Sequence, residues 1–332
     1  MPELRKDPIV DRWVIIASER AMRPSEYRVD RSLPTDGAVC PFCPGQEDKT
    51  PKDVLAYRDT PGGPWTLRVV PNRYPALKIE GELDREGVGL YDRMNGIGAH
   101  EVVIETPAHD KMFADLDVAS VERVLRAYQD RIVDLKKDSR FRYVMVFKNH
   151  GAAAGATIAH SHSQIIALPI VPVAVTRELD GAKRYHEHKE RCVYCDIVRQ
   201  ETSDGRRVIL DNGDYLAIAP WAPRSPFETW ILPRRHRAAY ESEPKDRLRS
   251  LAAVLRATLG KLAIALDHPA YNFILHSAPL ATGPEPAHYH WHIEIVPTVT
   301  HVAGFEWGSG CHINPTPPED AAAFLRDIEV RP

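Results

Sequence analysis

Cysteines and histidines recur in the same order in the two halves of this 332-residue chain. Each half carries a C-x-x-C pair, then an intervening histidine, His109 or His236, then an H-x-H pair. Thiolate and imidazole suit tetrahedral zinc, and a structural zinc site needs four such ligands. The repeated order therefore predicts one zinc site in each half. The candidate ligands are Cys40, Cys43, His109 and one of His160 or His162, and then Cys192, Cys195, His236 and one of His290 or His292.

The alternative role for a C-x-x-C pair is that of a redox dithiol. A thioredoxin-like pair opens a helix after a strand, whereas Cys40-Pro41-Phe42-Cys43-Pro44-Gly45 lies among turn-forming residues. Because the paired histidines also recur in register, the sequence favours zinc over redox chemistry.

The first H-x-H motif also provides a candidate nucleophile. In a strand, His160, His162 and Gln164 project to one face, so His160 can bind zinc while His162 stands beside it, free to react. A histidine that attacks phosphorus forms a phosphoramidate and divides one transfer into two displacements, which predicts ping-pong kinetics. Gln164 could donate a hydrogen bond to the oxyanion. The spacing alone leaves open that both histidines bind metal.

A run of small residues precedes this motif. Residues 148–157 read Lys-Asn-His-Gly-Ala-Ala-Ala-Gly-Ala-Thr. Small residues allow the backbone to approach a bound group, exposed N–H groups bind phosphate, and Lys148 could add positive charge. The spacing is not that of a Walker or dinucleotide loop, so the run indicates phosphate binding only in combination with the nearby histidine.

The elements expected around these residues repeat as well. Residues 117–137 and 247–266 carry apolar side chains at helical spacing. The runs that follow, residues 143–147 and 271–275, have the composition of β-strands. Each half therefore reads as strands, a helix, a strand and an H-x-H strand.

This repetition predicts an α+β fold made of two duplicated modules, with antiparallel sheets and packed helices. The expected modules are residues 1–175, which hold the catalytic motif, and residues 176–332. Residues 1–36 and 44–64 are rich in Pro, Arg and Asp and are expected to form surface segments.

The composition is that of an ordinary globular protein, with 43% hydrophobic and 27% charged residues. A formal net charge of −3 gives no general field for holding nucleic acid, so a nucleotide site must be local. The chain has no apolar run near 18 residues and no signal-peptide pattern at its start. We therefore expect no membrane partner and a cytoplasmic location.

Several motifs together resemble the galactose-1-phosphate uridylyltransferase family of the histidine-triad superfamily. They are Cys40-Pro41-Phe42-Cys43, Val70-Pro71-Asn72-Arg73-Tyr74-Pro75, Phe147-Lys148-Asn149, His160-Ser161-His162-Ser163-Gln164 and Gly304-Phe305-Glu306. The resemblance implies two histidine-triad-like modules, a homodimer, and nucleotide sugar and hexose 1-phosphate as substrates. The implied reaction exchanges UMP between UDP-glucose and galactose 1-phosphate through a covalent nucleotidyl-histidine.

The resemblance also implies roles for individual residues. His162 is the nucleophile, Gln164 binds the phosphoryl oxygens, and the first zinc site, one of two zinc sites per chain, comprises Cys40, Cys43, His109 and His160. The implied substrate contacts are Arg20 and Arg23 on the phosphate side, Asn72 and Arg73 at the nucleoside, Asn149, Gly155 and Thr157 at the phosphates, and Phe305 and Glu306 at the hexose, from the partner subunit.

Two departures from the common family pattern bear on function. The motif here is H-S-H-S-Q rather than H-P-H-G-Q, a form that also resembles ADP-glucose phosphorylase, which transfers adenylyl groups. The second metal site of the common form uses a glutamate and three histidines, which Glu178, His276 and His292 match in part. The serine-type relative uses two cysteines and two histidines, matched in full by Cys192, Cys195, His236 and His290, which we expect to bind zinc.

The sequence therefore leaves three alternatives to uridylyl transfer. The first is adenylyl transfer with phosphorolysis of ADP-glucose. The second is nucleotide hydrolysis, the chemistry of smaller histidine-triad proteins, although these extend the motif to a third histidine where this chain has Gln164. The third is a zinc-stabilised nucleotide-binding protein without enzymatic activity.

Overall fold

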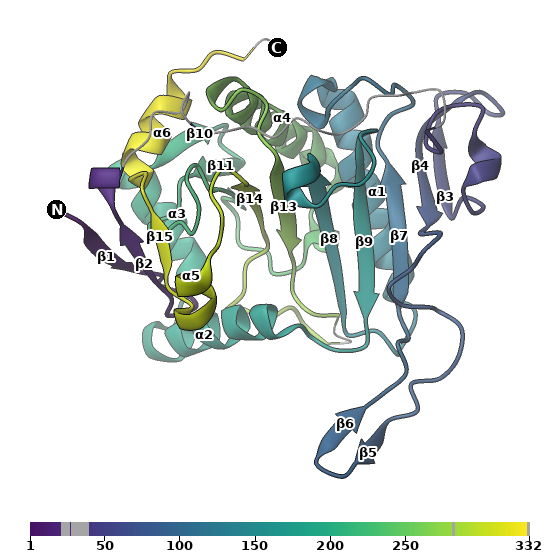
Figure 1. The fold of residues 1–332 in the computed structure, drawn as a ribbon, viewed down its shortest axis with the longest axis horizontal. Coiled ribbons are helices and arrows are strands. Elements are labelled where there is room, and N and C mark those ends of the chain that lie inside the picture. The colour runs from purple at the N-terminus through teal and green to yellow at the C-terminus, as the bar shows by residue number, and fades with distance from the viewer. Residues whose placement is uncertain (21–26, 28–39, 281–282, 331–332) are drawn as a thin grey trace.

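A ten-stranded antiparallel sheet runs through both halves of the chain in the computed structural model, which describes residues 1–20, 27, 40–280 and 283–330 (Figure 1). The strand order is β10-β11-β12-β14-β13-β8-β9-β7-β4-β3. The first half supplies β3 (Leu55–Arg58), β4 (Trp65–Pro71), β7 (Ala99–Ile104), β8 (Tyr143–His150) and β9 (His162–Leu168). The second half supplies β10 (Val208–Asp211), β11 (Tyr215–Ile218), β12 (Thr229–Pro233), β13 (Tyr271–His276) and β14 (His292–Pro297).

The two halves arrange their five strands in the same order. In each, the first three strands are neighbours, the fifth pairs with the third, and the fourth lies on the far side of the fifth. The fourth strands, β8 and β13, then pair with each other, from Tyr271 opposite His150 to Leu275 opposite Val146. The repeat expected from the sequence is thus present in the topology, and the expected antiparallel sheets are joined into one.

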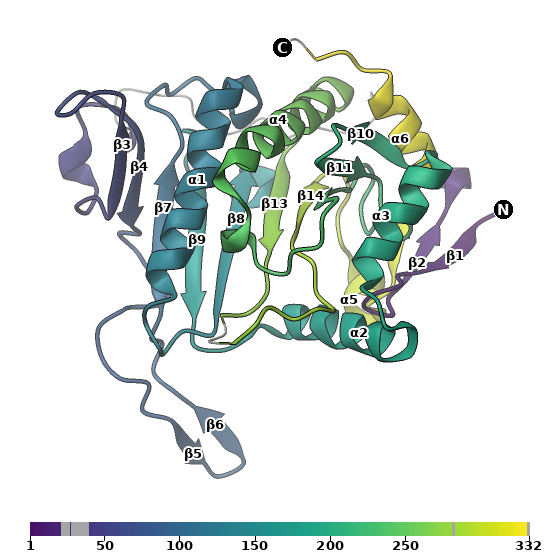
Figure 2. The ribbon, with the colours of Figure 1, turned by 180° about the vertical axis from the view of Figure 1, so that it is seen from behind.

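Two long helices cover one face of this sheet (Figure 2). They are α1 (Val118–Leu135) and α4 (Leu248–Ala265), and both expected apolar stripes are buried against the strands. Asp117 starts α1 by accepting a hydrogen bond from the Ser120 backbone N–H at 2.6 Å. The sequence predictions of these helices are confirmed, and the opposite face of the sheet is left for the sites described below.

The remaining α-helices of the described residues come after β9. A connecting helix, α2 (Val173–Lys189), is followed by α3 (Val193–Asp204), and the chain later forms α5 (Gly304–Ser309) and α6 (Pro318–Arg326). The predicted module boundary after residue 175 falls within α2, and the division into residues 1–175 and 176–332 stays a prediction. Among the described residues, no helix has the length and apolar composition needed to cross a membrane.

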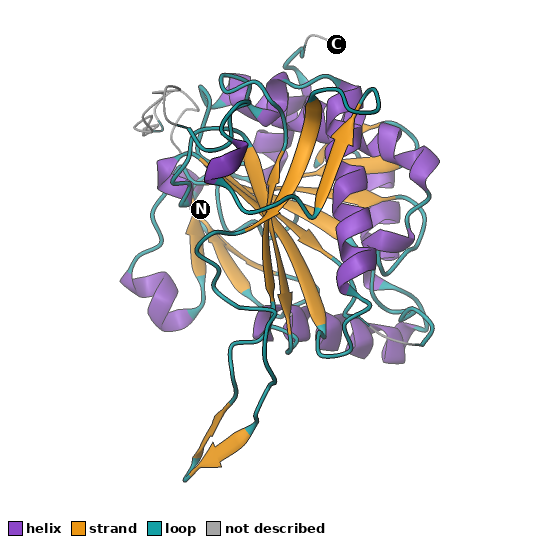
Figure 3. Cartoon of the chain, turned by 90° about the vertical axis from the view of Figure 1, so that its right-hand side faces the viewer, coloured by secondary structure: helices purple, strands orange, loops and turns teal. Residues whose placement is uncertain are grey.

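Smaller elements lie at the two ends of the sheet. The strands β1 (Glu3–Lys6), β2 (Trp13–Ile16) and β15 (His312–Asn314) form a three-stranded sheet, in which two early strands of the chain join one from near its other end, in the order β1-β2-β15. A hairpin of β5 (Glu86–Val88) and β6 (Tyr91–Arg93) extends away from the body (Figure 3).

Candidate active site and metal centres

His162 is the first residue of β9, and its side chain is 8% exposed. Its Nδ1–H donates to the backbone oxygen of His160 at 2.8 Å. A carbonyl oxygen can only accept, so Nδ1 carries the proton and Nε2 keeps its lone pair. Burial, and then the nearby charge of Lys148, lower the pKa of His162 below 6.5. The ring is therefore neutral at pH 7, which a nucleophile requires.

Two cavities meet at the His162 ring. One, of about 420 Å³, is bounded by residues 148–152 and 158–162, together with others from the neighbouring segments. The second, of about 400 Å³, brings together several predicted site residues. Both fall in the size range of small-molecule sites. The lining of the second cavity includes Asn72, Arg73, Thr157, His162 and Gln164.

The small-residue run forms a tight loop beside the nucleophile. Gly151 and Gly155 have φ angles of 82° and 87° on either side of a short turn. These are left-handed conformations that glycine adopts without strain, and a Cβ on Gly151 would lie 2.8 Å from the Cβ of Ala270. Asn149 lines the first cavity, and its Oδ1 accepts from Asn272 Nδ2 at 2.8 Å. Its amide hydrogens are thereby left for another acceptor.

Lys148 does not act as the free positive charge that the sequence suggested. Its side chain is 1% exposed, and Nζ donates to Glu105 at 2.7 Å, to Ser161 at 3.1 Å and to the backbone oxygen of His162 at 2.9 Å. These contacts use all three donors of the ammonium group. Lys148 therefore fixes the strand that carries His162, with its charge balanced by Glu105.

The two serines of the H-S-H-S-Q motif form hydrogen bonds with buried polar groups. Ser161 donates to Glu105 at 2.6 Å, and Ser163 accepts from the Tyr128 hydroxyl of α1 at 2.7 Å. Because side chains alternate across a strand, His162 and Gln164 face the site while the serines bind the buried polar groups behind it. The serine form of the motif thus belongs to a hydrogen-bond network on the helix side of the sheet.

The first predicted metal cluster assembles beside the nucleophile. The ligand atoms of Cys40, Cys43, His109 and His160 all lie within 4.8 Å of one another. Cys43 Sγ is 3.3 Å from His109 Nδ1 and 3.6 Å from His160 Nδ1. Zinc bonds of about 2.3 Å to sulfur and 2.1 Å to nitrogen place adjacent ligands about 3.6 Å apart in a tetrahedron. The donor set therefore fits zinc.

The ring of His160 is held in the orientation that a metal ligand needs. Its Nε2–H donates to the backbone oxygen of Thr106 at 2.7 Å, so Nδ1 faces the thiols with its lone pair. Such a second hydrogen bond fixes the tautomer of a ligating histidine. His160 thus connects the cluster to the nucleophile, because its own backbone oxygen orients His162.

The second predicted cluster repeats this arrangement. The ligand atoms of Cys192, Cys195, His236 and His290 lie within 4.8 Å of one another, and the first C-x-x-C residue opens α3. Cys195 Sγ is 3.4 Å from His236 Nδ1 and 3.6 Å from His290 Nδ1. His290 Nε2–H donates to the Pro233 backbone oxygen at 2.9 Å. These four residues also fit a tetrahedral zinc ion.

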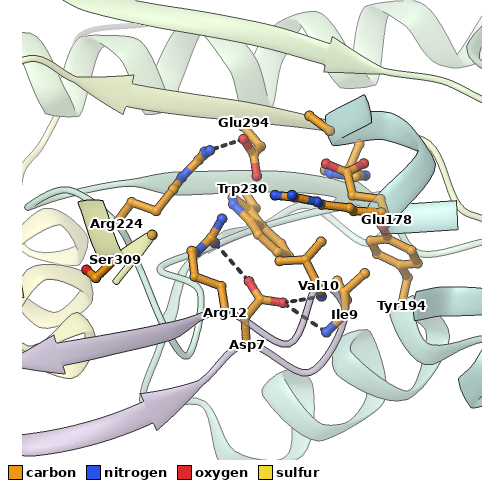
Figure 4. Close-up of a pocket in the computed structure, with 14 residues that line it drawn as sticks. Asp7, Ile9, Val10, Arg12, Glu178, Tyr194, Arg224, Trp230, Glu294 and Ser309 are labelled. Carbon is orange, nitrogen blue, oxygen red and sulfur yellow. Dashed lines mark hydrogen bonds and ion pairs between the residues drawn. The ribbon is translucent and has the colours of Figure 1, made fainter. Parts of the chain in front are cut away.

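A third cavity, of about 330 Å³, occupies the equivalent position in the second half (Figure 4). Glu294 lies opposite Trp230 on β12, as Gln164 lies opposite Val102 on β7. Tyr194 packs on His292 with ring centroids 5.1 Å apart, as Phe42 packs on His162 at 5.4 Å. The third cavity and the second cavity at His162 are therefore bounded by equivalent strands and by an equivalent aromatic ring.

Charged groups replace the amides in this third cavity. Glu294 stands where Gln164 does, and it forms an ion pair with Arg224 (Figure 4). The ring of His276, which faces His292 across the β13–β14 pair, is 3.2 Å from Glu178 and 3.4 Å from Glu294. Burial lowers the pKa of His276, but the two carboxylates outweigh this effect and raise the pKa to about 10.

The structure does not bring all predicted substrate residues to His162. Phe305 and Glu306 lie on α5 in the second half, and Glu306 accepts from the Ala303 backbone N–H at 3.0 Å. Among the described residues, the linings of the two cavities at His162 include neither these two nor Gly155. Arg20 ends a short helical turn, Ser18–Arg20, and Arg23 lies outside the described residues.

Two residues of the site were not singled out from the sequence. Glu105 is buried behind the nucleophile, and His100 contacts Gln164 Oε1 through Nε2 at 2.8 Å. His100 is the second residue of β7 and Glu105 follows its last residue, so the available signal is an ionisable residue near each end of a largely buried strand.

Comparisons with known proteins agree with this geometry. Residues 1–172 match the family profile described as galactose-1-phosphate uridyl transferase, N-terminal domain, and residues 104–328 match a domain of unknown function, DUF4921. ADP-glucose phosphorylase of Arabidopsis thaliana is 37% identical over 99% of this chain and 93% of its own length. Galactose-1-phosphate uridylyltransferase of Thermotoga maritima is 27% identical over 99% of both chains.

A solved structure extends the likeness to three dimensions. The crystal structure of an ADP-glucose phosphorylase from Arabidopsis thaliana with bound ADP-glucose matches with a TM-score of 0.85 and 36% identity, covering 99% of this chain and 100% of that one. The similarity thus spans both halves of the molecule. The chain belongs to the galactose-1-phosphate uridylyltransferase family of nucleotidyl-transferring enzymes.

Proposed function

We propose that this protein transfers the adenylyl group of ADP-glucose to phosphate through a covalent intermediate on His162. The observation that carries the chemistry is the free Nε2 of a neutral, buried imidazole that borders two cavities. The choice of adenylyl over uridylyl rests on the relatives, because the ADP-glucose phosphorylase is 37% identical and the uridylyltransferase 27%. Uridylyl transfer from UDP-glucose to galactose 1-phosphate is the second candidate.

The reaction would proceed in two displacements at the same phosphorus. Nε2 of His162 attacks the α-phosphorus of ADP-glucose, the bond from that phosphorus to the bridging oxygen breaks, and glucose 1-phosphate leaves with the electron pair. An oxygen of inorganic phosphate then attacks the adenylyl phosphorus, the P–N bond breaks, and ADP leaves. The ring gains positive charge in the first step, which the Nδ1–H bond to the His160 carbonyl stabilises.

Amide groups would stabilise the transferring phosphoryl group. Gln164 projects from β9 two residues beyond His162, so both side chains face the second cavity. We assign Gln164 a hydrogen bond to the phosphoryl oxygens, and we assign Asn72, Arg73 and Thr157, which line the same cavity, to the nucleotide. The burial of His162, which is 8% exposed, would limit access of the water that hydrolyses the adenylyl-histidine.

Zinc in the first cluster would have a structural role. Cys40, Cys43, His109 and His160 would hold the ion, and zinc would supply a rigid tetrahedral anchor for these four side chains. The residue that benefits is His160, because its backbone oxygen sets the tautomer of His162. The second cluster would anchor the second half in the same way.

The predicted homodimer forms part of this proposal. Phe305 is about half exposed on α5, and within a single chain this helix borders the third cavity rather than His162. A hexose contact by Phe305 and Glu306 therefore requires a second chain to bring α5 to the active site.

Mass spectrometry of the intact protein tests the proposal directly. After mixing with ADP-glucose or UDP-glucose, the added mass identifies both the covalent intermediate and its base, and we expect an adenylyl adduct. His162→Ala should form no adduct while keeping its metal content. The matched control is His292→Ala, because His292 holds the equivalent position in the second half. Adduct formation by His162→Ala, or its loss in His292→Ala alone, would contradict the assignment.

Hydrolysis is separated from transfer by isotope exchange. A transferase exchanges labelled glucose 1-phosphate into ADP-glucose without any second acceptor, since the first displacement is reversible. A hydrolase releases AMP and gives no exchange.

A further inference from the structure

The side chain of His100 lies directly behind Gln164 on the neighbouring strand. In the β7–β9 pair, Val102 lies opposite Gln164 and His100 opposite Ile166, so His100 and Gln164 are diagonal neighbours on one face. Such neighbours are within reach of long side chains. The contact joins His100 Nε2 to Gln164 Oε1 at 2.8 Å.

The backbone determines which nitrogen of His100 carries the proton. The backbone N–H of Ala76 points at His100 Nδ1 at a distance of 3.1 Å. A backbone N–H can only donate, so Nδ1 must hold a lone pair, and in the neutral ring the proton is then on Nε2. His100 Nε2–H therefore donates to Gln164, which must present its oxygen to His100. The orientation of the Gln164 amide follows from this hydrogen bond.

The orientation of Gln164 has a consequence for the site. With its oxygen engaged by His100, the Gln164 NH₂ group is the half of the amide that remains for the cavity shared with His162. An NH₂ group stabilises the negative charge that develops on phosphoryl oxygens, whereas the amide oxygen would repel it. The hydrogen bond from His100 thus selects the orientation that assists the reaction.

The same proton affects Asn72. Asn72 Oδ1 accepts a hydrogen bond from the Tyr74 backbone N–H at 2.9 Å. The other end of the same amide, Asn72 Nδ2, lies at a distance of 3.1 Å from His100 Nε2. Both nitrogens carry hydrogen, so this contact is not a hydrogen bond, and the Asn72 NH₂ group needs another acceptor. Asn72 and Gln164 line one cavity, and the His100 tautomer makes both available there as donors.

In the second half, the positions equivalent to His100 and Gln164 hold two glutamates, which provide no hydrogen-bond donor when ionised. Two residues before Trp230, Glu228 occupies the position that His100 holds two residues before Val102. Glu228 and Glu294 both pair with Arg224. The acidic residue at the Gln164 position is thus neutralised by a cation, and no amide donor faces that cavity from this position.

We propose that His100 is a positioning residue that holds the Gln164 amide with its NH₂ group toward the phosphoryl group in transfer. The proposal rests on the proposed function, in which Gln164 contacts that group. It assigns His100 no contact with the substrate and no change of protonation during the reaction.

Two substitutions test the roles of the two ring nitrogens of His100 one at a time. In His100→Asn, the amide oxygen can replace Nδ1 as the acceptor for Ala76, but nothing reaches Gln164. In His100→Gln, the longer amide can replace Nε2–H as the donor to Gln164, but the acceptor for Ala76 is lost. A positioning role and a purely structural role for the backbone contact therefore predict opposite rankings of the two variants.

The readout is the single-turnover rate at which label from adenine-labelled ADP-glucose appears on the protein. We expect His100→Asn to be slower by about tenfold, the scale of one lost oriented hydrogen bond, and His100→Gln to stay within about threefold of the parent. The Kd for ADP, the melting temperature and the metal content should be similar in both variants. A parent-like rate in His100→Asn, or a slower rate in His100→Gln than in His100→Asn, overturns the proposal.

A measurement on the free protein keeps this inference distinct from the proposed function. The ¹⁵N chemical shifts of the His100 ring report its tautomer without any substrate. The Nε2–H form supports the proposal, and the Nδ1–H form overturns it. If the parent protein forms no adduct with either nucleotide sugar, the proposed function fails, and the ring tautomer still decides whether His100 donates to Gln164.

Discussion

At the scale of single residues, the charge of Lys148 is placed behind the nucleophile. It contacts Glu105, Ser161 and the His162 backbone oxygen, and both charged side chains are at most 1% exposed. A buried ion pair contributes little net stability, but removing one partner leaves an uncompensated charge. The main effect of the pair is therefore to hold the start of β9 in place through Lys148, and its net contribution to the free energy of unfolding is small.

Lys148→Met should lower the stability of the protein, because it removes one partner of this buried ion pair. The substitution leaves Glu105 buried with Ser161 as its close donor, so we expect the free energy of unfolding to fall by about 3–5 kcal/mol. Urea unfolding measures the change. The control is Lys136→Met, because Lys136 pairs with Glu241 at 3.2 Å but is 41% exposed, and a loss below about 1 kcal/mol is expected there. Equal losses in the two variants would show that burial does not set the strength of this pair.

Residue roles were predictable from sequence only where the motif itself carried them. The spacing of His160, His162 and Gln164 correctly placed the last two on one face of a strand. The roles of Lys148 and His100 depend on partners from distant segments of the chain, namely Glu105, which follows β7, and the backbone of Ala76. Such partners are brought together by the tertiary fold, which a single sequence does not reveal.

At the scale of elements, periodicity determined what could be predicted. The amphipathic helices α1 and α4 and the strands β8 and β13 were expected from long repeating patterns. The strands β1 and β2 were not, because residues 1–36 were expected to be a surface segment and each strand has only four residues. They form by pairing with each other and with β15, near the other end of the chain.

The two metal clusters should differ in their effect on catalysis although they share a donor set. Cys40→Ser should remove one metal ion per chain and slow adduct formation, because His160 belongs to that cluster and its backbone oxygen orients His162. Cys192→Ser should also remove one ion but should lower mainly the thermal stability, since its cluster lies in the second half. Metal analysis and single-turnover labelling measure the two effects. If both substitutions slow adduct formation equally, the first cluster has no specific effect on His162, and the prediction is wrong.

At the scale of the whole molecule, the two halves share a framework and differ in chemistry. Both have the same strand order, an aromatic ring on the second H-x-H histidine, and a cluster of two cysteines and two histidines. The first half faces its cavity with amides, and the second with ion pairs around Glu294. The framework was predictable from the repeated motif, whereas the ion pairs of Glu294 depend on Arg224 and His276, which lie outside the motif.

The pairing of β8 with β13 makes the second half a support for the first. Asn272 of β13 donates to Asn149 Oδ1 at 2.8 Å and to the Ala154 backbone oxygen at 2.9 Å, so one side chain of the second half contacts two points of the small-residue loop beside His162. We expect Asn272→Ala to raise the KM for ADP-glucose about fivefold, the scale of one lost hydrogen bond, because Asn149 can then rotate its amide. Steady-state kinetics measure this change.

The control for this prediction is Asn212→Ala. Asn212 also donates from its side chain across the fold, to Ser250 at 2.9 Å, but both of these residues belong to the second half. It should lower stability slightly and leave KM unchanged. If Asn272→Ala keeps the parent KM, the loop holds its shape through Gly151, Gly155 and the β8 backbone alone, and the second half contributes stability without shaping the active site. If KM rises only in Asn272→Ala, the pairing of the two halves is part of the active site, and neither half would bind substrate normally alone.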